Sequence, residues 1–258
     1  MGQLAVGVDI GGTGIKGAPV DRATGSFTGE RVRLLTPAPA TPDAVAAVVG
    51  EVLDKLAAGG YAAGGPVGVT VPAVIREGVV ETAAHIDPSW IGTDAVTLLE
   101  QATGRPVAVL NDADAAGIAE VRFGAGRDRS GVVVLLTLGT GIGSALFVDG
   151  ALVPNTELGH LHLHHGEAEQ WAAASIREQD ELSWKRYAHR LQKYLELVQR
   201  LLWPQLIIVG GGVSKKAGKF LHQITLRTEV VPAQLHNDAG IVGAALAAPA
   251  PAASRSAR

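Results

Sequence analysis

Two glycine-rich segments each follow a short apolar run, and both could cradle a phosphate group. The first is Gly11-Gly12-Thr13-Gly14, and the second is Gly139-Thr140-Gly141-Ile142-Gly143. A third glycine cluster, Gly210-Gly211-Gly212, follows another apolar run. Backbone N–H groups in such turns can approach phosphate oxygens because no side chain blocks them. The alternative is a tight hairpin that needs glycine only for positive φ angles.

Polar side chains around the first turn extend the phosphate interpretation. Asp9 could hold Mg²⁺ directly or through water, because Mg²⁺ prefers a few carboxylates together with phosphate oxygens. Thr13 and Lys16 could contact phosphate oxygens. Because the glycine pattern recurs along the chain, phosphate binding is favoured over a purely structural hairpin.

Two acidic residues stand where a predicted strand ends and a helix begins. Asp112, which follows Asn111, could cap the helix, or it could act as a general base that takes a hydroxyl proton during phosphoryl transfer. Spacing alone does not separate these two roles. Asp114 is better explained as an acid in the first turn, favoured by the helix dipole.

A carboxylate and an imidazole three residues apart could bind the neighbouring hydroxyls of a sugar: Glu157 and His160. His160, His162 and His164 would lie on one face if this segment were a strand, which would also allow a metal site. The chain has no cysteine and no clear fourth ligand, so we do not expect zinc here.

Hydrophobic patterning predicts alternating strands and helices that would position these residues. The strand–glycine turn–strand pattern occurs twice, about 128 residues apart, which indicates an internal duplication with two halves that face one another. A long amphipathic helix follows the histidine segment. Strands are expected at 4–10, 67–71, 107–110, 132–138, 144–148 and 206–209, and helices at 43–57, 94–103, 115–123, 184–202 and 238–247.

Composition excludes several classes of protein. The 258 residues are 47% hydrophobic and 18% charged, which excludes a disordered chain, and the net charge of −3 argues against a nucleic-acid coat protein. The absence of cysteine excludes disulfides, thiol catalysis and Cys-ligated zinc. No signal peptide or membrane span is predicted, so we expect a cytoplasmic protein with no nucleic-acid or membrane partner.

The small net charge hides one strongly cationic stretch. Residues 185–227 carry nine Lys or Arg against one acid, Glu196, so this stretch has a charge of +8 and the rest has −11. Such a stretch could follow the charges of a polyanion, or it could simply be a solvated face. The residues favoured for such a basic track are Arg186, Arg190, Lys193, Lys215, Lys216 and Lys219.

Five motifs occur in the order seen in ROK-family sugar kinases, which the chain resembles over about residues 4–247. They are Asp9-Ile-Gly-Gly-Thr-Gly-Ile-Lys16, Asn111-Asp112-Ala-Asp114, Leu138-Gly-Thr-Gly-Ile-Gly143, Glu157-Leu-Gly-His160 and Gly210-Gly-Gly-Val-Ser-Lys215. Other segments are most similar to the polyphosphate-using glucokinases of that family: Ser89–Thr93, Leu182-Ser-Trp184, Gly212–Lys216 and Asn237–Gly243.

The resemblance implies an α/β fold of two domains, the actin-like ATPase and sugar-kinase (ribonuclease H-like) fold with a central cleft. We expect an N-terminal domain over 1–110, a C-terminal domain with the donor site over 111–248, and a disordered tail over 249–258. A homodimer is also implied.

The resemblance further implies roles for individual residues. Asp112 would be the general base for the 6-hydroxyl of glucose, and Asn111, Glu157, His160 and Glu169 would bind the sugar. Inorganic polyphosphate, and ATP as well, would be the phosphoryl donor, with Mg²⁺. The donor would be held by Asp9, Gly11, Gly12, Thr13, Lys16, Thr140, Gly141, Gly210, Gly211, Gly212, Lys215 and Lys216.

The sequence departs from the family in two places. The Cys-rich zinc motif of many members is missing between His160 and Glu169, so no structural zinc is expected. His85 stands where the polyphosphate-using branch usually has Asn, which puts one sugar contact in doubt.

Two other functions are compatible with parts of the sequence. One is a strictly ATP-dependent hexokinase for mannose, fructose or an N-acetylhexosamine, because a few hydrogen bonds set sugar specificity. The other is a sugar-sensing repressor of the same family. Such repressors carry a helix-turn-helix before the first glycine loop, and we expect none here because that loop begins at Gly11.

Overall fold

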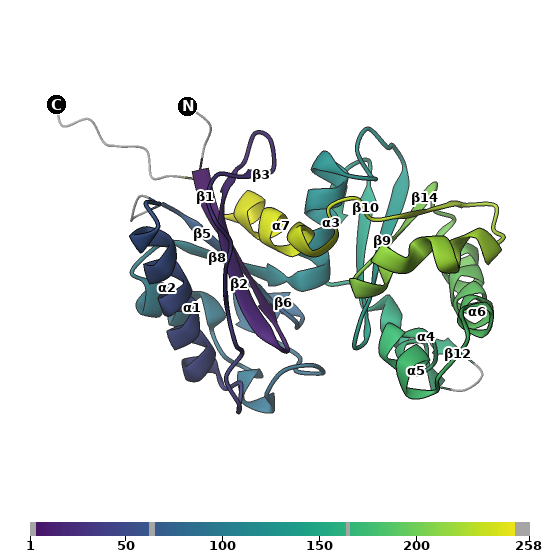
Figure 1. Ribbon diagram of the computed structural model, residues 1–258, viewed down its shortest axis with the longest axis horizontal. Coiled ribbons are helices and arrows are strands. Elements are labelled where there is room, and N and C mark those ends of the chain that lie inside the picture. The colour runs from purple at the N-terminus through teal and green to yellow at the C-terminus, as the bar shows by residue number, and fades with distance from the viewer. Residues whose placement is uncertain (1–3, 62–64, 164–165, 251–258) are drawn as a thin grey trace. The chain divides into compact units, whose positions relative to one another are not determined.

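The computed structural model describes residues 4–61, 65–163 and 166–250 (Figure 1). Its contacts divide the chain into two compact units. The first unit is Met1–Ala115 together with Gly240–Arg258, and the second is Ala116–Ala239. Each unit contains one large β-sheet with helices packed on it.

The first sheet combines an antiparallel hairpin with parallel neighbours. Its strands are β1 (Leu4–Gly11), β2 (Gly14–Asp21), β3 (Ser26–Phe27), β4 (Val32–Leu34), β5 (Val67–Val71) and β8 (Val107–Asn111). They run in the order β3-β2-β1-β5-β8, and β4 pairs with β2. β1 and β2 are antiparallel, whereas β1, β5 and β8 are parallel. All residues of β5 are buried, as expected for a parallel strand covered on both faces.

Helices cover both faces of this sheet. α1 (Pro42–Ala58) and α2 (Ala95–Thr103) lie on one face, and α7 (Ala239–Ala247) lies on the other (Figure 1). Pro42 occupies the first turn of α1, where a missing N–H costs nothing. The Asp94 carboxylate caps α2 by accepting from the Thr97 N–H at 2.9 Å. α3 (Asp112–Phe123) follows β8 directly.

The second sheet repeats the arrangement of the first. Its strands are β9 (Val132–Leu138), β10 (Ile142–Val148), β11 (Ala151–Val153), β14 (Leu206–Gly210) and β15 (Glu229–Pro232), and their order is β11-β10-β9-β14-β15. β9 and β10 are antiparallel, whereas β9, β14 and β15 are parallel. Both sheets therefore place a glycine-turn hairpin beside two parallel strands, and the duplication expected from the sequence is present in the topology.

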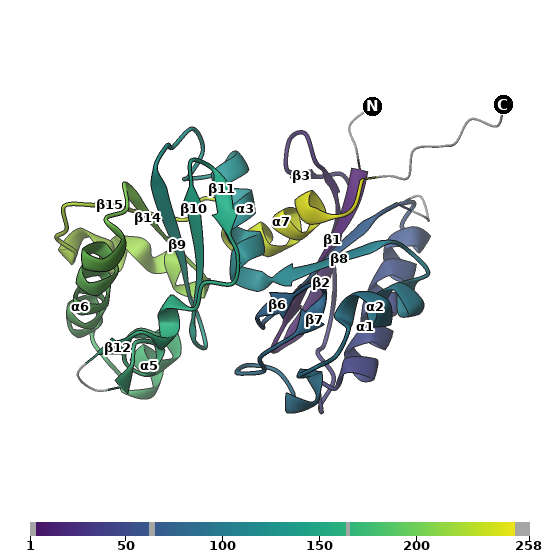
Figure 2. The ribbon, with the colours of Figure 1, turned by 180° about the vertical axis from the view of Figure 1, so that it is seen from behind.

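A long helix covers one face of the second sheet (Figure 2). It is α6 (Trp184–Leu202), and the Ser183 hydroxyl caps it by accepting from the Arg186 N–H at 3.3 Å. Its buried side chains are Tyr187, Ala188, Leu191, Tyr194, Leu195 and Val198. They join the core cluster that also contains β9 and β14. Leu201, in the last turn of the helix, is 54% exposed.

Short elements complete the fold. They are β6 (Ile75–Arg76), β7 (Val79–Val80), β12 (His162–Leu163), β13 (Gly166–Glu167), α4 (Glu169–Ala172), α5 (Ala174–Gln179), and the 3₁₀ segments η1 (Pro88–Trp90), η2 (Leu158–His160), η3 (Gly212–Lys219), η4 (Leu221–Gln223) and η5 (His236–Asp238). Among the described residues, no helix combines the length and the apolar character needed to cross a membrane.

The two compact units differ from the expected domains at two places. Residues 111–115 and the segment from Gly240 onward belong to the first unit. The reason is close packing between α7 and the start of α3: a Cβ on Gly243 would lie 1.7 Å from the Ala115 carbonyl oxygen. Of the expected tail, residues 251–258 lie outside the described part of the chain.

Glycines without room for a Cβ hold α7 against the first sheet. A Cβ on Gly68 would lie 1.7 Å from the Ala244 carbonyl oxygen, and one on Gly7 would lie 1.8 Å from that of Ile241. Because these contacts are with backbone atoms, no side-chain rotation relieves them. Backbone-to-backbone packing therefore requires glycine at both positions.

Gly68→Ala is expected to destabilise the protein by about 3 kcal/mol, the upper part of the range for overpacked cores. The matched control is Gly50→Ala in α1, where the nearest atom to a Cβ is 3.4 Å away and helix propensity favours alanine. Chemical denaturation of both variants measures the difference. Equal unfolding free energies for the two variants would contradict the packing argument.

Candidate functional site

The first glycine-rich turn joins β1 to β2, with Gly12 and Thr13 exposed at its tip. The Thr36 hydroxyl donates to the Gly11 carbonyl oxygen at 2.5 Å, and the Arg33 guanidinium donates to that of Thr13 at 3.2 Å. In a trans peptide the following N–H points opposite to the carbonyl. The Gly12 N–H shares a peptide with the anchored Gly11 carbonyl, so it points away from Thr36.

The glycines of this turn are not required by backbone conformation. Gly11, Gly12 and Gly14 all lack a positive φ. A Cβ on Gly14 would lie 2.8 Å from Arg33 Nε, whereas one on Gly12 would meet nothing within 4 Å. Glycine at position 12 leaves the turn open rather than making the hairpin possible.

Asp9 lies on β1 opposite Lys16 on β2. Its Oδ1 accepts from the Thr70 hydroxyl at 3.0 Å, and its Oδ2 lies 3.4 Å from Lys16 Nζ. The side chain is 18% exposed, so water can still reach it. Such a carboxylate fits the oxygen-ligand chemistry of Mg²⁺, most simply through bridging water.

Asn111, the last residue of β8, caps helix α3. Its Oδ1 accepts from the N–H groups of Ala113 and Asp114 at 2.8 and 3.1 Å, which is the N-cap pattern. Its Nδ2 donates to the Ala73 carbonyl oxygen at 3.0 Å. Asn111 therefore supplies the N-cap, and Asp112 Oδ1 also accepts from the Ala113 N–H at 2.9 Å. Asp112 is the first helical residue and is only partly buried.

The second glycine-rich turn joins β9 to β10 and is anchored by one serine. Ser175 at the start of α5 donates its N–H to the Gly139 carbonyl at 3.0 Å and its hydroxyl to the Thr140 carbonyl at 2.6 Å. The N–H groups of Thr140 and Gly141 belong to these same peptides and point the opposite way. This arrangement presents two neighbouring donors on one side of the turn, which suits an anion.

Of the three consecutive glycines, only Gly211 has a backbone conformation and surroundings that require glycine. Gly211 has φ +76°, and a Cβ there would lie 2.4 Å from the Leu138 carbonyl oxygen. Gly210 has ordinary contacts, and a Cβ on Gly212 would meet nothing within 4 Å. Gly211 thus brings the end of β14 close to the second glycine turn.

A pocket of about 330 Å³ in the second unit joins these features, and we call it the loop pocket. Gly139 and Thr140 line it together with Gly212 and Lys216. The remaining lining residues are Leu138, Ala174, Ser175, Arg177, Glu178, Trp184 and Val213. Lys215, its neighbour on η3, is exposed and is not among the lining residues.

Cations surround the indole ring at the edge of the loop pocket. The Arg177 guanidinium carbon lies 3.8 Å from the centroid of Trp184, and the Nζ atoms of Lys216 and Lys219 lie at 6.0 and 5.8 Å. Phe220 stacks on the indole with an interplanar angle of 11°. The pocket therefore combines an aromatic wall, positive charge and backbone N–H groups, which together suit a phosphorylated ligand.

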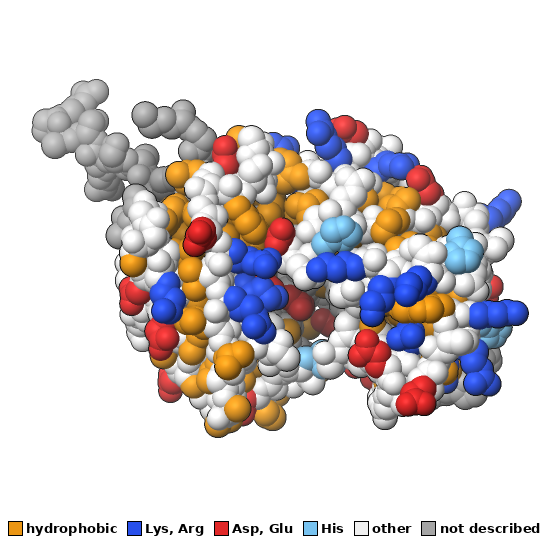
Figure 3. All heavy atoms as spheres, viewed as in Figure 1, with side chains coloured by type: hydrophobic (Ala, Val, Ile, Leu, Met, Phe, Trp, Pro, Cys, Tyr) orange, Lys and Arg blue, Asp and Glu red, His pale blue; other side chains and the backbone are white. Residues whose placement is uncertain are grey.

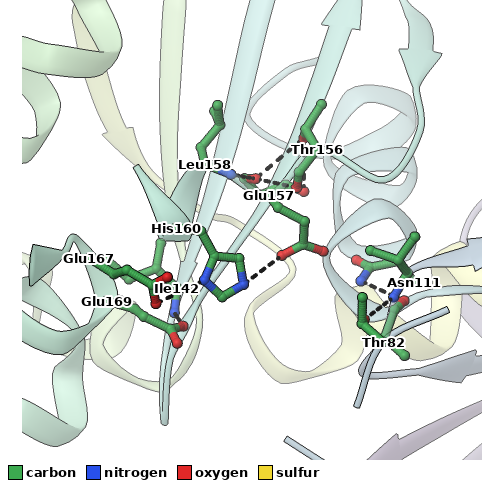
Figure 4. Close-up of polar contacts among 12 residues, drawn as sticks. Thr82, Asn111, Ile142, Thr156, Glu157, Leu158, His160, Glu167 and Glu169 are labelled. Carbon is green, nitrogen blue, oxygen red and sulfur yellow. Dashed lines mark hydrogen bonds and ion pairs between the residues drawn. The ribbon is translucent and has the colours of Figure 1, made fainter. Parts of the chain in front are cut away.

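A second group of polar residues surrounds His160 in the same unit (Figure 4). His160 Nδ1 lies 3.1 Å from Glu167 Oε2, and Nε2 lies 3.6 Å from Glu157 Oε2. A Cβ on Gly159 would lie 2.2 Å from the Ile142 carbonyl oxygen, so this glycine lets η2 pack against β10. The imidazole therefore lies between two carboxylates in a defined orientation.

Glu169 joins this group from the start of α4. Its Oε2 accepts from the Ile142 N–H at 3.2 Å. Ligand atoms of His160, Glu167 and Glu169 lie within 4.8 Å of one another, close enough to share a cation. In this structure His160 and Glu167 contact each other directly.

The neighbouring charges change the ionisation of His160. Partial burial lowers the pKa of its imidazole, but the hydrogen bond to Glu167 and the charges of Glu169, Glu167 and Glu157 raise it more. The net effect is a pKa above the usual value. The protonated form of the ring is therefore more favoured than in a free histidine.

Sequence reasoning missed Glu167, Ser175 and Arg177. Glu167 lies on β13, a strand of two residues, which is too short for a periodic pattern. The expected strand carrying alternating histidines is wrong for His160, which lies in η2, while His162 lies on β12. His164 and His165 lie outside the described residues.

Comparisons with known proteins match both units. The ROK family model matches residues 5–173. The chain is 51% identical over 242 residues to a polyphosphate glucokinase of Mycobacterium tuberculosis (strain CDC 1551 / Oshkosh), covering 93% of this chain and 89% of the relative. The crystal structure of the inorganic polyphosphate/ATP-glucomannokinase from Arthrobacter sp. strain KM has a TM-score of 0.91 and 54% identity, covering 94% of this chain and 97% of that one.

A further solved structure carries ligands. It is a ROK family glucokinase from Streptomyces griseus in complex with glucose and AMPPNP, with a TM-score of 0.81 and 26% identity, covering 94% of this chain and 98% of that one. These matches confirm the expected fold class, the α/β fold of the ROK sugar kinases.

Glu167→Gln is expected to lower the pKa of His160, because it removes a charge and weakens the hydrogen bond. Since the folded-state pKa is raised, the ion pair stabilises the protein fully below the unfolded pKa of about 6.5. This stabilisation is lost as pH rises through the folded value. NMR titration of the His160 ring measures the shift, and the exposed Glu51→Gln serves as control. An unchanged His160 pKa in Glu167→Gln would show that Glu167 does not act on the ring.

Proposed function

Because the chain belongs to the ROK family, we propose that it transfers a phosphoryl group to the 6-hydroxyl of glucose, with inorganic polyphosphate and also ATP as donor. The observation that carries this proposal is the loop pocket, where anchored backbone N–H groups, Trp184 and Lys216 surround one space. The names of the relatives at 51% and 54% identity support the choice of substrates.

In the proposed reaction, Asp112 is the general base. Phosphoryl transfer needs little covalent chemistry from the protein, which mainly orients the nucleophile and neutralises charge. Asp112 would accept the proton of the 6-hydroxyl as its oxygen attacks the terminal phosphorus. The capping bonds made by Asn111 support this role, because the N–H groups of Ala113 and Asp114 both have Asn111 as an acceptor and do not require Asp112.

Glu157, His160 and Glu169 would bind the sugar hydroxyls, and Asn111 would add its side-chain amide. The two acids can accept hydrogen bonds from hydroxyls, and the protonated imidazole can donate one. The ion pair with Glu167 supports this assignment because it holds the ring in one orientation.

The two glycine turns and the triple glycine would hold the donor phosphates. Backbone N–H groups at Gly11, Gly12, Thr140 and Gly141 supply uncharged donors, and Lys16 supplies positive charge. A bound Mg²⁺ would neutralise charge on the transferred phosphoryl group, with Asp9 as its holder through water. Thr13, Gly210, Gly211, Gly212, Lys215 and Lys216 complete the proposed donor set.

Mannose is a second candidate acceptor, because the Arthrobacter relative is described as a glucomannokinase. A strictly ATP-dependent hexokinase for another sugar is the competing function. We also propose a homodimer and a cytoplasmic location, as the family resemblance and the absence of cysteine led us to expect.

A coupled assay of glucose, mannose and fructose, each with ATP and with polyphosphate, tests the function. Glucose with polyphosphate should be an efficient pair, and Asp112→Asn should lower kcat by about 10²–10⁴-fold, as for loss of a general base. The matched control is Asp43→Asn, an exposed acid in the first turn of α1, which should keep full activity. Near-normal turnover by Asp112→Asn would show that the base is misassigned.

Lys216→Ala is expected to raise the KM for both donors, and more for polyphosphate, because Lys216 lines the loop pocket. Lys215→Ala removes the same charge from the same segment outside that lining, and it should have a smaller effect. Since ion contacts with a polyanion weaken with salt, the difference between donors should shrink as ionic strength rises. Steady-state kinetics at several salt concentrations measure it. An equal rise in KM for ATP and polyphosphate at every salt concentration would show that Lys216 has no specific role in polyphosphate recognition.

A further inference from the structure

A second pocket in the second unit, of about 630 Å³, lies between the segment that follows α5 and the first turns of α6, and we call it the helix pocket. Lys185, Arg186, His189 and Arg190 of α6 line it. Trp171, Asp180 and Leu182 complete the lining. None of these residues has a role in the reaction described above.

The helix pocket keeps an excess of positive charge. Asp180 is its one acid, and it is already paired with Arg190 at 2.8 Å. Among the described residues, no ion pair is found for Lys185 or Arg186, and both are exposed. Figure 3 shows Lys and Arg side chains grouped over the second unit near η3 and α6. Two cations without an ion pair among the described residues therefore line this pocket.

Other contacts order the floor of this pocket. Arg190 also donates to the Trp171 carbonyl oxygen at 3.2 Å, and its guanidinium carbon lies 5.7 Å from the indole centroid. Leu182 is buried beside them. An apolar floor lowers the local dielectric constant, which strengthens the attraction between the cations and an anion above it.

The helix pocket and the loop pocket flank the start of α6. Trp184 lines the loop pocket, whereas Leu182 and Lys185, on either side of it in the chain, line the helix pocket. Arg177 of α5 lines the loop pocket, and Asp180, just beyond α5, lines the helix pocket. An anionic chain that leaves the loop pocket therefore needs to pass only the first turn of α6 to reach the second group of cations.

We propose that the helix pocket binds the distal phosphates of a polyphosphate chain whose terminal phosphate reacts at the loop pocket. This inference rests on the proposed function. ATP and tripolyphosphate end near the loop pocket, so they gain nothing from the helix pocket. A long chain occupies both pockets at once, and the covalent link raises the effective concentration of its distal part. The helix pocket therefore makes donor affinity depend on chain length.

The test compares two double variants of the same cationic stretch. Lys185→Ala/Arg186→Ala removes two cations from the helix pocket, and Arg200→Ala/Arg227→Ala removes two exposed cations that are not among its lining residues. The assay uses glucose as acceptor and three donors: ATP, tripolyphosphate and a long polyphosphate of narrow length distribution. Melting temperatures check that both variants are folded.

Lys185→Ala/Arg186→Ala is expected to raise the KM for long polyphosphate about tenfold, since it removes one of two linked contacts. The KM for ATP and tripolyphosphate, and kcat with every donor, should stay at wild-type values. The slope of log KM against log salt for the long chain should fall by about 1–2, as for two lost phosphate contacts. Arg200→Ala/Arg227→Ala should leave all these values near wild type.

Two results would overturn the inference. One is an equal change in KM for tripolyphosphate and the long chain, and the other is an equal effect of the two double variants. Failure of the proposed function has a different signature, because the wild-type protein would then use no polyphosphate of any length.

Discussion

Close backbone packing between α7 and the first sheet is the constraint on which the first unit depends. Gly7 and Gly68 let the strands approach the Ile241 and Ala244 carbonyls more closely than any side chain would allow. The same approach brings the start of α7 to Asp9, because a Cβ on Gly240 would lie 3.1 Å from Asp9 Oδ1. The environment of the acid beside the first glycine turn is therefore set by glycines distant from it in the sequence.

Charged side chains order the polar site of the second unit. His160 lies between Glu157 and Glu167, and Glu169 accepts a hydrogen bond from the backbone of β10. Glu157 and Glu167 both raise the pKa of the ring and contact it directly, so ionisation and orientation are coupled. These contacts thereby hold in place the histidine for which we propose sugar binding.

The cationic stretch is divided by the fold into parts with different surroundings. Lys216 faces the loop pocket, and Lys185 and Arg186 face the helix pocket. Lys193 instead pairs with Glu196 at 3.3 Å on the exposed side of α6. Residues that look equivalent in a charge count therefore have separate roles. These cations lie in different surroundings because their side chains point in different directions around a helix or turn.

The spacing of hydrophobic residues and glycines along the chain was sufficient to predict the long elements and both glycine turns. The expected helix at 184–202 and the expected strands at 67–71 and 132–138 agree with α6, β5 and β9, because buried periodicity is a local property. Tertiary structure decided that Asn111 caps α3, that Glu167 reaches His160 and that α7 belongs to the first unit. These outcomes depend on contacts between residues on different elements. A strand of two residues is too short to produce a periodic pattern in the sequence. The direction in which a side chain points produces no such pattern either.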